Sequence, residues 1–177
     1  EARSLQMSLV PQRTHRLTGG QVTVRLRSAG HVGGDMVGFF EIDQRRLGLY
    51  AIDVSGHGMA AALLTTRLAG LFSGTSSERN IALRAGPDGP EVRSPAAVAA
   101  ALHRLMMTEL QSERYLTLGY AEIDRQTGDL RLVQAGHPHP VIQHADGSVS
   151  RLGSGGLPLG LIDDGQWQDI HVRLAPG

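Results

Sequence analysis

The sequence predicts an α+β domain in which antiparallel sheets are layered with helices. Three observations lead to this class: strand-like alternation near both ends of the chain, two strong helices between those regions, and short turns that let neighbouring strands pair. The chain has 177 residues, of which 41% are hydrophobic, and its formal net charge is zero. This length suits one globular domain with a sizeable core, so we expect a single domain over residues 1–177.

The first segment, residues 1–11, reads as the end of a helix, because Leu5 and Leu9 lie four residues apart and Pro11 follows. Its apolar stripe either continues a linker helix from upstream or packs on its own domain. The chain begins with Glu1 rather than Met, so we expect it to be a fragment of a longer protein.

Strands and a first helix should follow. Alternation over residues 21–27 predicts a half-buried strand, and the apolar runs 36–43 and 47–52 around a short polar turn predict a β-hairpin. Residues 59–72 predict a helix that ends at Gly74, with a core-facing stripe of leucines. That stripe comprises Leu64, Leu68 and Leu71.

The connection from Gly74 to Arg93 is rich in glycine, proline and charge, so we expect it to be mobile and to add little to the core. Ser94 and Pro95 then predict the cap and first turn of a second helix. Its buried stripe is expected to be Val98, Leu102, Leu105 and Met106. The remainder reads as a β meander with strands over 115–124, 130–134, 140–144, 149–152 and 167–174.

The composition excludes several classes of chemistry. There is no cysteine, which excludes thiolate catalysis, zinc–thiolate sites and disulfides. There is no lysine either, so neither a complete phosphate-binding P-loop nor a Schiff base can form. The balanced charge gives no indication of nucleic-acid binding, and no apolar run approaches the length of a membrane span. Carboxylate, histidine and hydroxyl chemistry remain, with any metal ion these groups bind.

Two glycine-flanked aspartates are the candidate functional residues. Asp35 follows Gly33 and Gly34, and Asp53 opens the run Asp-Val-Ser-Gly-His-Gly. Each could serve only in a turn or as a helix cap. Together, at strand ends that converge, they favour a metal site.

The register of the predicted hairpin decides whether the two carboxylates meet. If the loop is the three residues 44–46, Asp43 pairs with Leu47, Asp35 faces Ser55, and Asp53 lies diagonally from Asp35 on the same face. Two carboxylates can reach a shared metal pair from there, with oxygens within about 6 Å of each other. A two-residue loop would put the aspartates on opposite faces of the sheet.

The order of the motifs resembles the bacterial branch of PPM-type serine/threonine phosphatases, the SpoIIE/RsbU branch, including phosphatases fused to response regulators. The stretches that carry the resemblance are Ala2 to Pro11, Gly33-Gly34-Asp35, Asp53 to Gly58, Thr117-Leu118, Ala135-Gly136-His137-Pro138 and Leu157-Pro158-Leu159-Gly160. The resemblance implies an α-β-β-α sandwich of two antiparallel sheets flanked by helices, with metal ions between the sheets.

By position, Asp35 and Asp53 resemble the family's ligands for Mn²⁺ or Mg²⁺, and Val54 stands where a backbone carbonyl binds one of two ions. Oxygen ligands of this kind suit Mg or Mn better than Zn or Cu. Ser55 or His57 occupies the region where some eukaryotic relatives carry a histidine proposed as general acid. His137 stands where such relatives place an acidic residue near a further metal, although a loop histidine bonded to backbone is the simpler interpretation.

The chain departs from the family pattern at two places. Gly38 stands where an acid is common, and the chain stops at the turn Leu174 to Gly177, before the strand that carries the family's Asp-Gly metal motif. We therefore expect the domain to lack its C-terminal part, and metal binding by this chain to be weak.

The resemblance implies hydrolysis of phosphoserine or phosphothreonine on a protein, with an anti-sigma-factor antagonist as the substrate and water as the nucleophile. It also implies a cytoplasmic protein that can dimerise through its N-terminal helix. Two alternatives stay open. The chain could be a non-catalytic interaction module of the same fold, which the missing aspartates favour, or a different metal-dependent phosphohydrolase.

Overall fold

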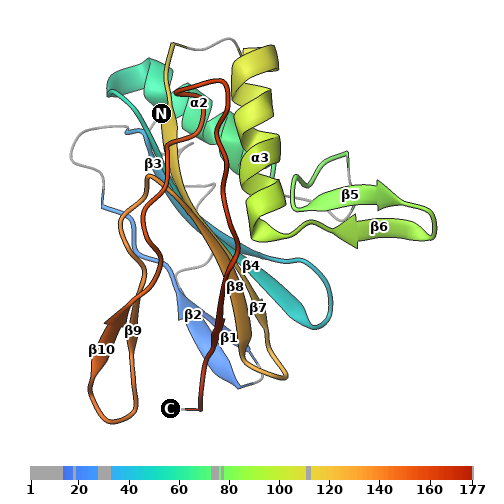
Figure 1. Ribbon diagram of the computed structural model, residues 1–177, viewed down its shortest axis with the longest axis vertical. Coiled ribbons are helices and arrows are strands. Elements are labelled where there is room, and N and C mark those ends of the chain that lie inside the picture. The colour runs from blue at the N-terminus through green and yellow to red at the C-terminus, as the bar shows by residue number, and fades with distance from the viewer. Residues whose placement is uncertain are drawn as a thin grey trace.

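A five-stranded antiparallel sheet forms the centre of the molecule, with the strand order β11-β8-β7-β4-β3. Figure 1 shows the computed structural model, which describes residues 14–17, 19–27, 33–72, 76, 78–110 and 113–176. The predicted N-terminal helix over residues 1–11 lies outside these ranges. The strands of the central sheet are β3 (Asp35–Glu41), β4 (Arg46–Val54), β7 (Leu116–Asp124), β8 (Asp129–Ala135) and β11 (Ile170–Arg173).

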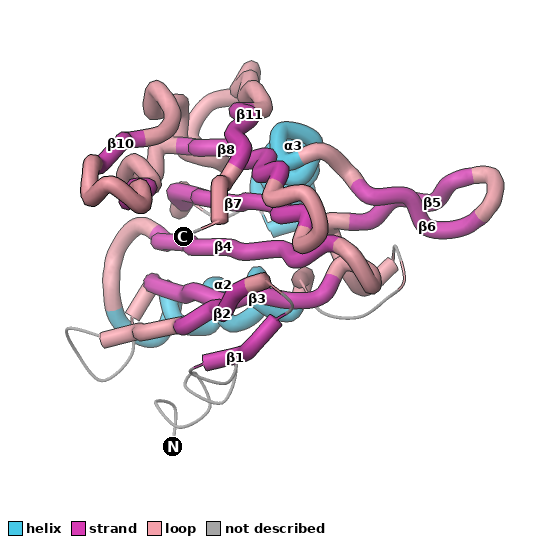
Figure 2. Tube along the Cα trace, turned by 90° about the horizontal axis from the view of Figure 1, so that it is seen from below, coloured by secondary structure: helices cyan, strands magenta, loops and turns pink. Residues whose placement is uncertain are grey.

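Two helices, α2 (Gly58–Gly70) and α3 (Pro95–Leu105), cover one face of this sheet, as Figures 1 and 2 show. A π-helical turn, Met106–Leu110, extends α3. Because successive strand residues point to opposite faces, every second residue of β4 and β7 is buried under the helices. The core between sheet and helices includes Ile52, Val54, Leu68, Val98, Leu102, Leu116 and Leu118.

Helix α3 begins as the sequence predicts. The Ser94 hydroxyl accepts a hydrogen bond from the backbone N–H of Ala97 at 3.3 Å, and Pro95 occupies the first turn. A second cap comes from far along the chain, since the Asp169 carboxylate accepts from the N–H of Ala96 at 2.6 Å. The predicted buried stripe is confirmed for Val98, Leu102 and Met106, whereas Leu105 is half-buried.

Helix α2 differs from its prediction in both its end and its buried face. It ends at Gly70 rather than at Gly74. Small residues, rather than a leucine stripe, form most of the face that meets the sheet, and Leu64 is only half-buried. The buried residues of α2 are Ala61, Ala62, Thr65, Leu68 and Ala69. Small side chains let the helix backbone approach the strands closely. This brings α2 against the start of β3 and the end of β4.

The other face of the sheet carries two hairpins. One is β1 (Thr14–Leu17) with β2 (Gly20–Thr23), and the other is β9 (Val141–Gln143) with β10 (Val149–Arg151). An apolar groove between hairpins and sheet is lined by side chains such as Val22, Leu49 and Ile142. Among the described residues the expected second sheet is therefore represented by separate hairpins, and the strand predicted over 21–27 ends at Thr23.

The connection before α3 corrects the sequence prediction. It contains a hairpin of β5 (Leu83–Gly86) and β6 (Gly89–Val92), which extends away from the rest of the molecule in Figure 1. Ala82 and Leu83 are almost fully buried. The prediction that residues 74–93 add little to the core was wrong at these two positions. The buried Asn80 side chain explains the entry, because it accepts the N–H of Ala82 at 3.0 Å and turns the chain inward.

No helix within the described ranges combines the length and the apolar character needed to cross a membrane.

Candidate active site

The two candidate aspartates lie directly opposite each other in the β3–β4 hairpin. Asp35 is the Cα partner of Asp53, and both side chains are exposed on the sheet face away from the helices. Directly opposed residues have Cβ atoms roughly 4.5–5.5 Å apart, so their carboxylates can share a cation. The sequence predicted the shared face and the convergence of the pair.

The register itself differs from the prediction by two residues. Glu41, rather than Asp43, pairs with Leu47, so Asp35 faces Asp53 instead of Ser55. The Asp43 side chain causes the wider turn, because its Oδ1 atom accepts the backbone N–H groups of Arg45 and Arg46 at 2.8 and 2.7 Å. A shift of two residues keeps every side chain on its original face, and for this reason the same-face prediction is confirmed.

The glycines before Asp35 let β3 begin against the end of β4. The Gly34 carbonyl accepts the N–H of Val54 at 3.1 Å and the Thr65 hydroxyl of α2 at 2.8 Å. A Cβ atom on Gly34 would overlap the Val54 carbonyl oxygen, so glycine is required there. Val54 buries its side chain completely and leaves its carbonyl beside Gly34 at the aspartate end of the sheet. Thr65, which the sequence did not indicate, ties α2 to this loop.

In the part of the chain that the structure describes, neither aspartate is part of a salt bridge. Partial desolvation of the Asp53 carboxyl, which is otherwise exposed, and the neighbouring Asp35 carboxylate raise the pKa of Asp53, and this outweighs the lowering effect of His137. Two opposed carboxylates of this kind offer oxygen ligands to a divalent cation. Within the described ranges, however, no three His, Asp or Glu side chains gather closely enough to form a metal site.

His137 lies on the same side of the sheet as the aspartates. Its Nδ1 atom is 2.8 Å from the hydroxyl oxygen of Thr117, and Thr117 is the Cα partner of Asp53 on the next strand. Burial lowers the pKa of His137, while the charges of Asp53 and Asp35 act to raise it. The simpler sequence interpretation, a loop histidine bonded to backbone, was wrong, because the ring is bonded to a side chain that faces the aspartate pair.

The loop that follows Asp53 is held from the start of β7. The Ser55 carbonyl accepts a hydrogen bond from Arg114 Nη1 at 2.6 Å, and the Ser55 hydroxyl accepts the N–H of Tyr115 at 3.1 Å. The left-handed backbone of Gly56, with φ at 90°, lies against the Arg114 guanidinium. His57 is exposed at the N-terminal cap position of α2, and its side chain makes no capping bond. Nothing in the sequence pattern indicated Arg114.

Comparisons with known proteins identify relatives of the chain. Phosphoserine phosphatase RsbP of Bacillus subtilis is 30% identical over 152 residues, which are 86% of this chain and 36% of RsbP. The chain thus spans about a third of that relative. The SiaA-PP2C domain of Pseudomonas aeruginosa superposes with a TM-score of 0.68 at 19% identity, over 99% of this chain and 65% of that domain. RsbX, solved in complex with magnesium, gives 0.56 at 13% identity, over 81% of this chain and 62% of RsbX.

These structural likenesses show the fold, which is that of PP2C-type (PPM-type) phosphatase domains, as the sequence predicted. The family description "Stage II sporulation protein E (SpoIIE)" matches residues 43–177, which is most of the chain. The match begins in the β3–β4 turn and includes Asp53, Thr117 and His137. The chain therefore belongs to the SpoIIE family.

Proposed function

We propose that the protein is a metal-dependent protein phosphatase that hydrolyses phosphoserine or phosphothreonine with an activated water. The direct pairing of Asp35 with Asp53 on an exposed strip of the sheet carries this proposal. Membership of the SpoIIE family and the identity to a phosphoserine phosphatase support it. The absence of cysteine fits a mechanism without a cysteinyl-phosphate intermediate.

Mn²⁺ or Mg²⁺ fits the donor set. The carboxylates of Asp35 and Asp53 and the backbone carbonyl of Val54 would hold the ions, and these hard oxygen ligands suit both metals. Bound ions would lower the pKa of a coordinated water and offset charge on the phosphoryl oxygens. The chain's own contribution is orientation. The Gly34 carbonyl, bonded to Val54 N–H and to the Thr65 hydroxyl, fixes the start of β3 and with it the Asp35 side chain.

The substrate that we propose is a phosphorylated regulatory protein, specifically an anti-sigma-factor antagonist, in the cytoplasm. The family resemblance supports this choice. We further propose that residues 1–177 act as one domain and that residues 1–11 end a linker helix through which two copies pair.

A second function is favoured by one specific observation. The described residues supply two opposed carboxylates but no group of three His, Asp or Glu side chains close enough to bind a metal. Magnesium sites with few protein ligands depend largely on water and give little affinity. The alternative is therefore a non-catalytic interaction or dimerisation module with the same fold.

One experiment separates the two functions. Phosphate release from a phosphoserine peptide is measured with the full-length protein in Mn²⁺ or Mg²⁺, for the native sequence and for Asp35→Asn. If the proposal holds, turnover requires the metal, and Asp35→Asn loses at least about 100-fold in kcat/KM, since even indirect disturbance of a metal site costs about 10- to 100-fold.

Asp88→Asn provides the matched control, because Asp88 is an exposed aspartate in the turn of the β5–β6 hairpin. Its activity should equal that of the native protein. Metal-independent or undetectable turnover by the native protein would instead support the interaction module.

A further inference from the structure

His137 occupies a prepared position over β7. The backbone of Gly136 turns with φ at 66° and forms a parallel bridge with Leu118, so the His137 ring enters from the β8 side of β7. It lies over Gly119, where an added Cβ atom would be only 3.2 Å from its Cδ2 atom. Glycine thus leaves room for the ring, and a larger residue at 119 would press against it.

The main chain that carries His137 is also fixed. The buried Gln134 side chain donates to the His137 carbonyl at 2.5 Å and accepts from the N–H of Gly155 at 2.8 Å. These bonds tie the end of β8 to the loop that follows β10. His137 is consequently held both at its backbone carbonyl and at the Nδ1 atom of its ring.

The position of the ring relative to the aspartates follows from strand register. Asp35, Asp53 and Thr117 are consecutive cross-strand partners and share one face of the sheet. The Thr117 hydroxyl holds Nδ1 at 2.8 Å, and the ring extends from the β8 side. Nδ1 lies toward Thr117 and Cδ2 lies over Gly119, so the far edge of the ring, with Nε2, extends toward β4. The Asp53 and Asp35 charges both act on this ring.

The hydroxyl partner suits a ring that changes its protonation at Nε2. Thr117 Oγ1 can donate to a bare Nδ1 or accept from Nδ1–H. The ring keeps this hydrogen bond, and its orientation, whether or not Nε2 carries a proton.

We propose that His137 is a catalytic residue that donates a proton from Nε2 to the leaving oxygen of the phosphorylated side chain, with Thr117 as its positioning residue. The inference rests on the phosphatase function proposed above. In the step, the attacking hydroxide forms a new bond to phosphorus, and the bond from phosphorus to the serine Oγ breaks. The electron pair of that bond goes to Oγ, which takes the Nε2 proton and leaves as the alcohol. The neutral imidazole regains a proton from solvent.

The test uses two substrates that differ in their need for a proton. A serine alkoxide is a poor leaving group without protonation, whereas the nitrophenolate of p-nitrophenyl phosphate leaves without one. General acid catalysis contributes about 10²- to 10⁴-fold. His137→Gln should therefore lose at least about 100-fold in kcat on a phosphoserine peptide and less than about 10-fold on the aryl ester.

Thr117→Val should show the same substrate dependence with a smaller loss on the peptide, and Thr117→Ser should restore the native rate. His139→Gln is the matched control, because His139 is exposed and bonds the Leu152 carbonyl at 2.9 Å. His57→Gln tests the other histidine near the aspartates. The full-length protein is used throughout, and calorimetry measures the Mn²⁺ affinity of each variant.

The outcomes are distinct. A selective loss on the peptide with unchanged Mn²⁺ affinity supports the proposal. Equal losses on both substrates, a parallel loss of Mn²⁺ affinity, or a selective loss in His57→Gln instead would overturn the role of His137 and leave the phosphatase function standing. No metal-dependent turnover of either substrate by the native protein would overturn both proposals.

Discussion

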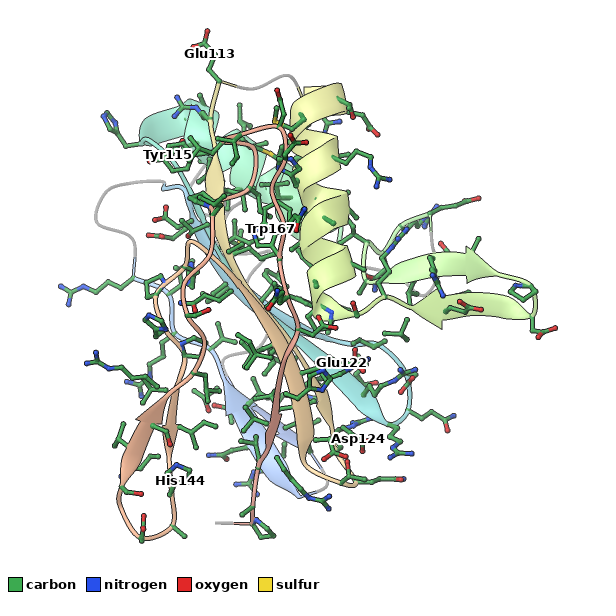
Figure 3. The ribbon with its side chains drawn as sticks, viewed as in Figure 1. Glu113, Tyr115, Glu122, Asp124, His144 and Trp167 are labelled. Carbon is green, nitrogen blue, oxygen red and sulfur yellow. The ribbon has the colours of Figure 1, made fainter. Side chains whose placement is uncertain are left out.

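The two ends of the central sheet differ in the partners of their carboxylates. At the β3–β4 turn, Asp43 is bonded to Arg46 at 2.8 Å, and the nearly buried Glu122 accepts from Arg131 Nη2 at 3.0 Å through each of its oxygens. At the other end, Asp35 and Asp53 face each other and two like charges are set side by side. Figure 3 shows how far apart these ends lie, with Tyr115 near one end of β7 and Glu122 and Asp124 toward the other.

The pKa shifts run in opposite directions at the two ends. Burial alone would raise the pKa of Asp43, but hydrogen bonds from the Arg46 side chain and from two backbone N–H groups outweigh burial and lower it. Burial and the Asp35 charge raise the pKa of Asp53. The β3–β4 hairpin thus has a stabilised carboxylate, Asp43, in its turn and an unfavourably placed one, Asp53, at its open end. Groups that reduce stability without a partner are candidates for binding one.

The largest effect on stability is expected at the β3–β4 turn end of the sheet, where arginines pair with the carboxylates. Glu122→Gln leaves the guanidinium of Arg131 without its charged partner and weakens the approach of Arg46, which lies 3.6 Å from Glu122. Breaking a buried ion pair typically costs about 3–5 kcal/mol. Both arginines are about one-third exposed, so we expect a loss of about 2 kcal/mol in the free energy of unfolding, measured by urea denaturation. A change under about 0.5 kcal/mol, the usual range of surface substitutions, would show that this network is only a surface feature.

The sequence predicted the pair of Asp35 and Asp53 better than it predicted the ion pairs at the β3–β4 turn. Alternation in two apolar runs was enough to place Asp35 and Asp53 on one face, because a period of two survives a register shift of two. The shift itself came from the Asp43 side chain, whose bonds to Arg45 and Arg46 no periodicity reveals. The buried alanine face of α2 was likewise missed, since close helix–sheet approach depends on tertiary packing.

Contacts between segments that are distant in the sequence could not be predicted from the sequence pattern. The contact of His137 with Thr117 requires that β7 and β8 be neighbours with a known register, and the tie between Thr65 and Gly34 requires that α2 lie against β3. The sequence predicted a mobile connection where the β5–β6 hairpin lies, because glycine, proline and charged residues are common both in hairpin turns and in mobile loops. The motifs indicated the candidate site residues, and the three-dimensional contacts added the residues that support them.

The other end of the sheet should respond with the opposite sign. Asp53→Asn removes one of two directly opposed negative charges, so the metal-free protein should gain up to about 1 kcal/mol at neutral pH. For a chain of this size that corresponds to a rise in Tm of about 2–4 °C. The same variant should lose the Mn²⁺-induced increase in Tm that we expect of the native protein. Thermal melts with and without Mn²⁺ measure both, and a metal-free Tm below the native value would contradict the account of the pair.

The smallest effect, and the one that tests the comparison most directly, is the dependence of stability on pH. The pKa of Asp43 is lower in the folded protein than the unfolded value of about 3.9, so its contribution is present at neutral pH and is lost as the pH falls through the folded pKa. Asp43 is more than a third exposed, and solvent screening reduces the pH-dependent part to about 0.3 kcal/mol. For Asp53 the folded pKa is raised, so its unfavourable contribution grows as the pH rises above the unfolded value.

Asp43→Asn should therefore be less stable than the native protein at pH 7, and Asp53→Asn more stable. In urea denaturation each difference should shrink toward zero as the pH falls through the folded pKa of the carboxyl concerned, and the Asp43 difference should persist to lower pH than the Asp53 difference. Differences of the same sign at pH 7 would mean that the two ends of the sheet do not differ electrostatically in the way their hydrogen bonds indicate.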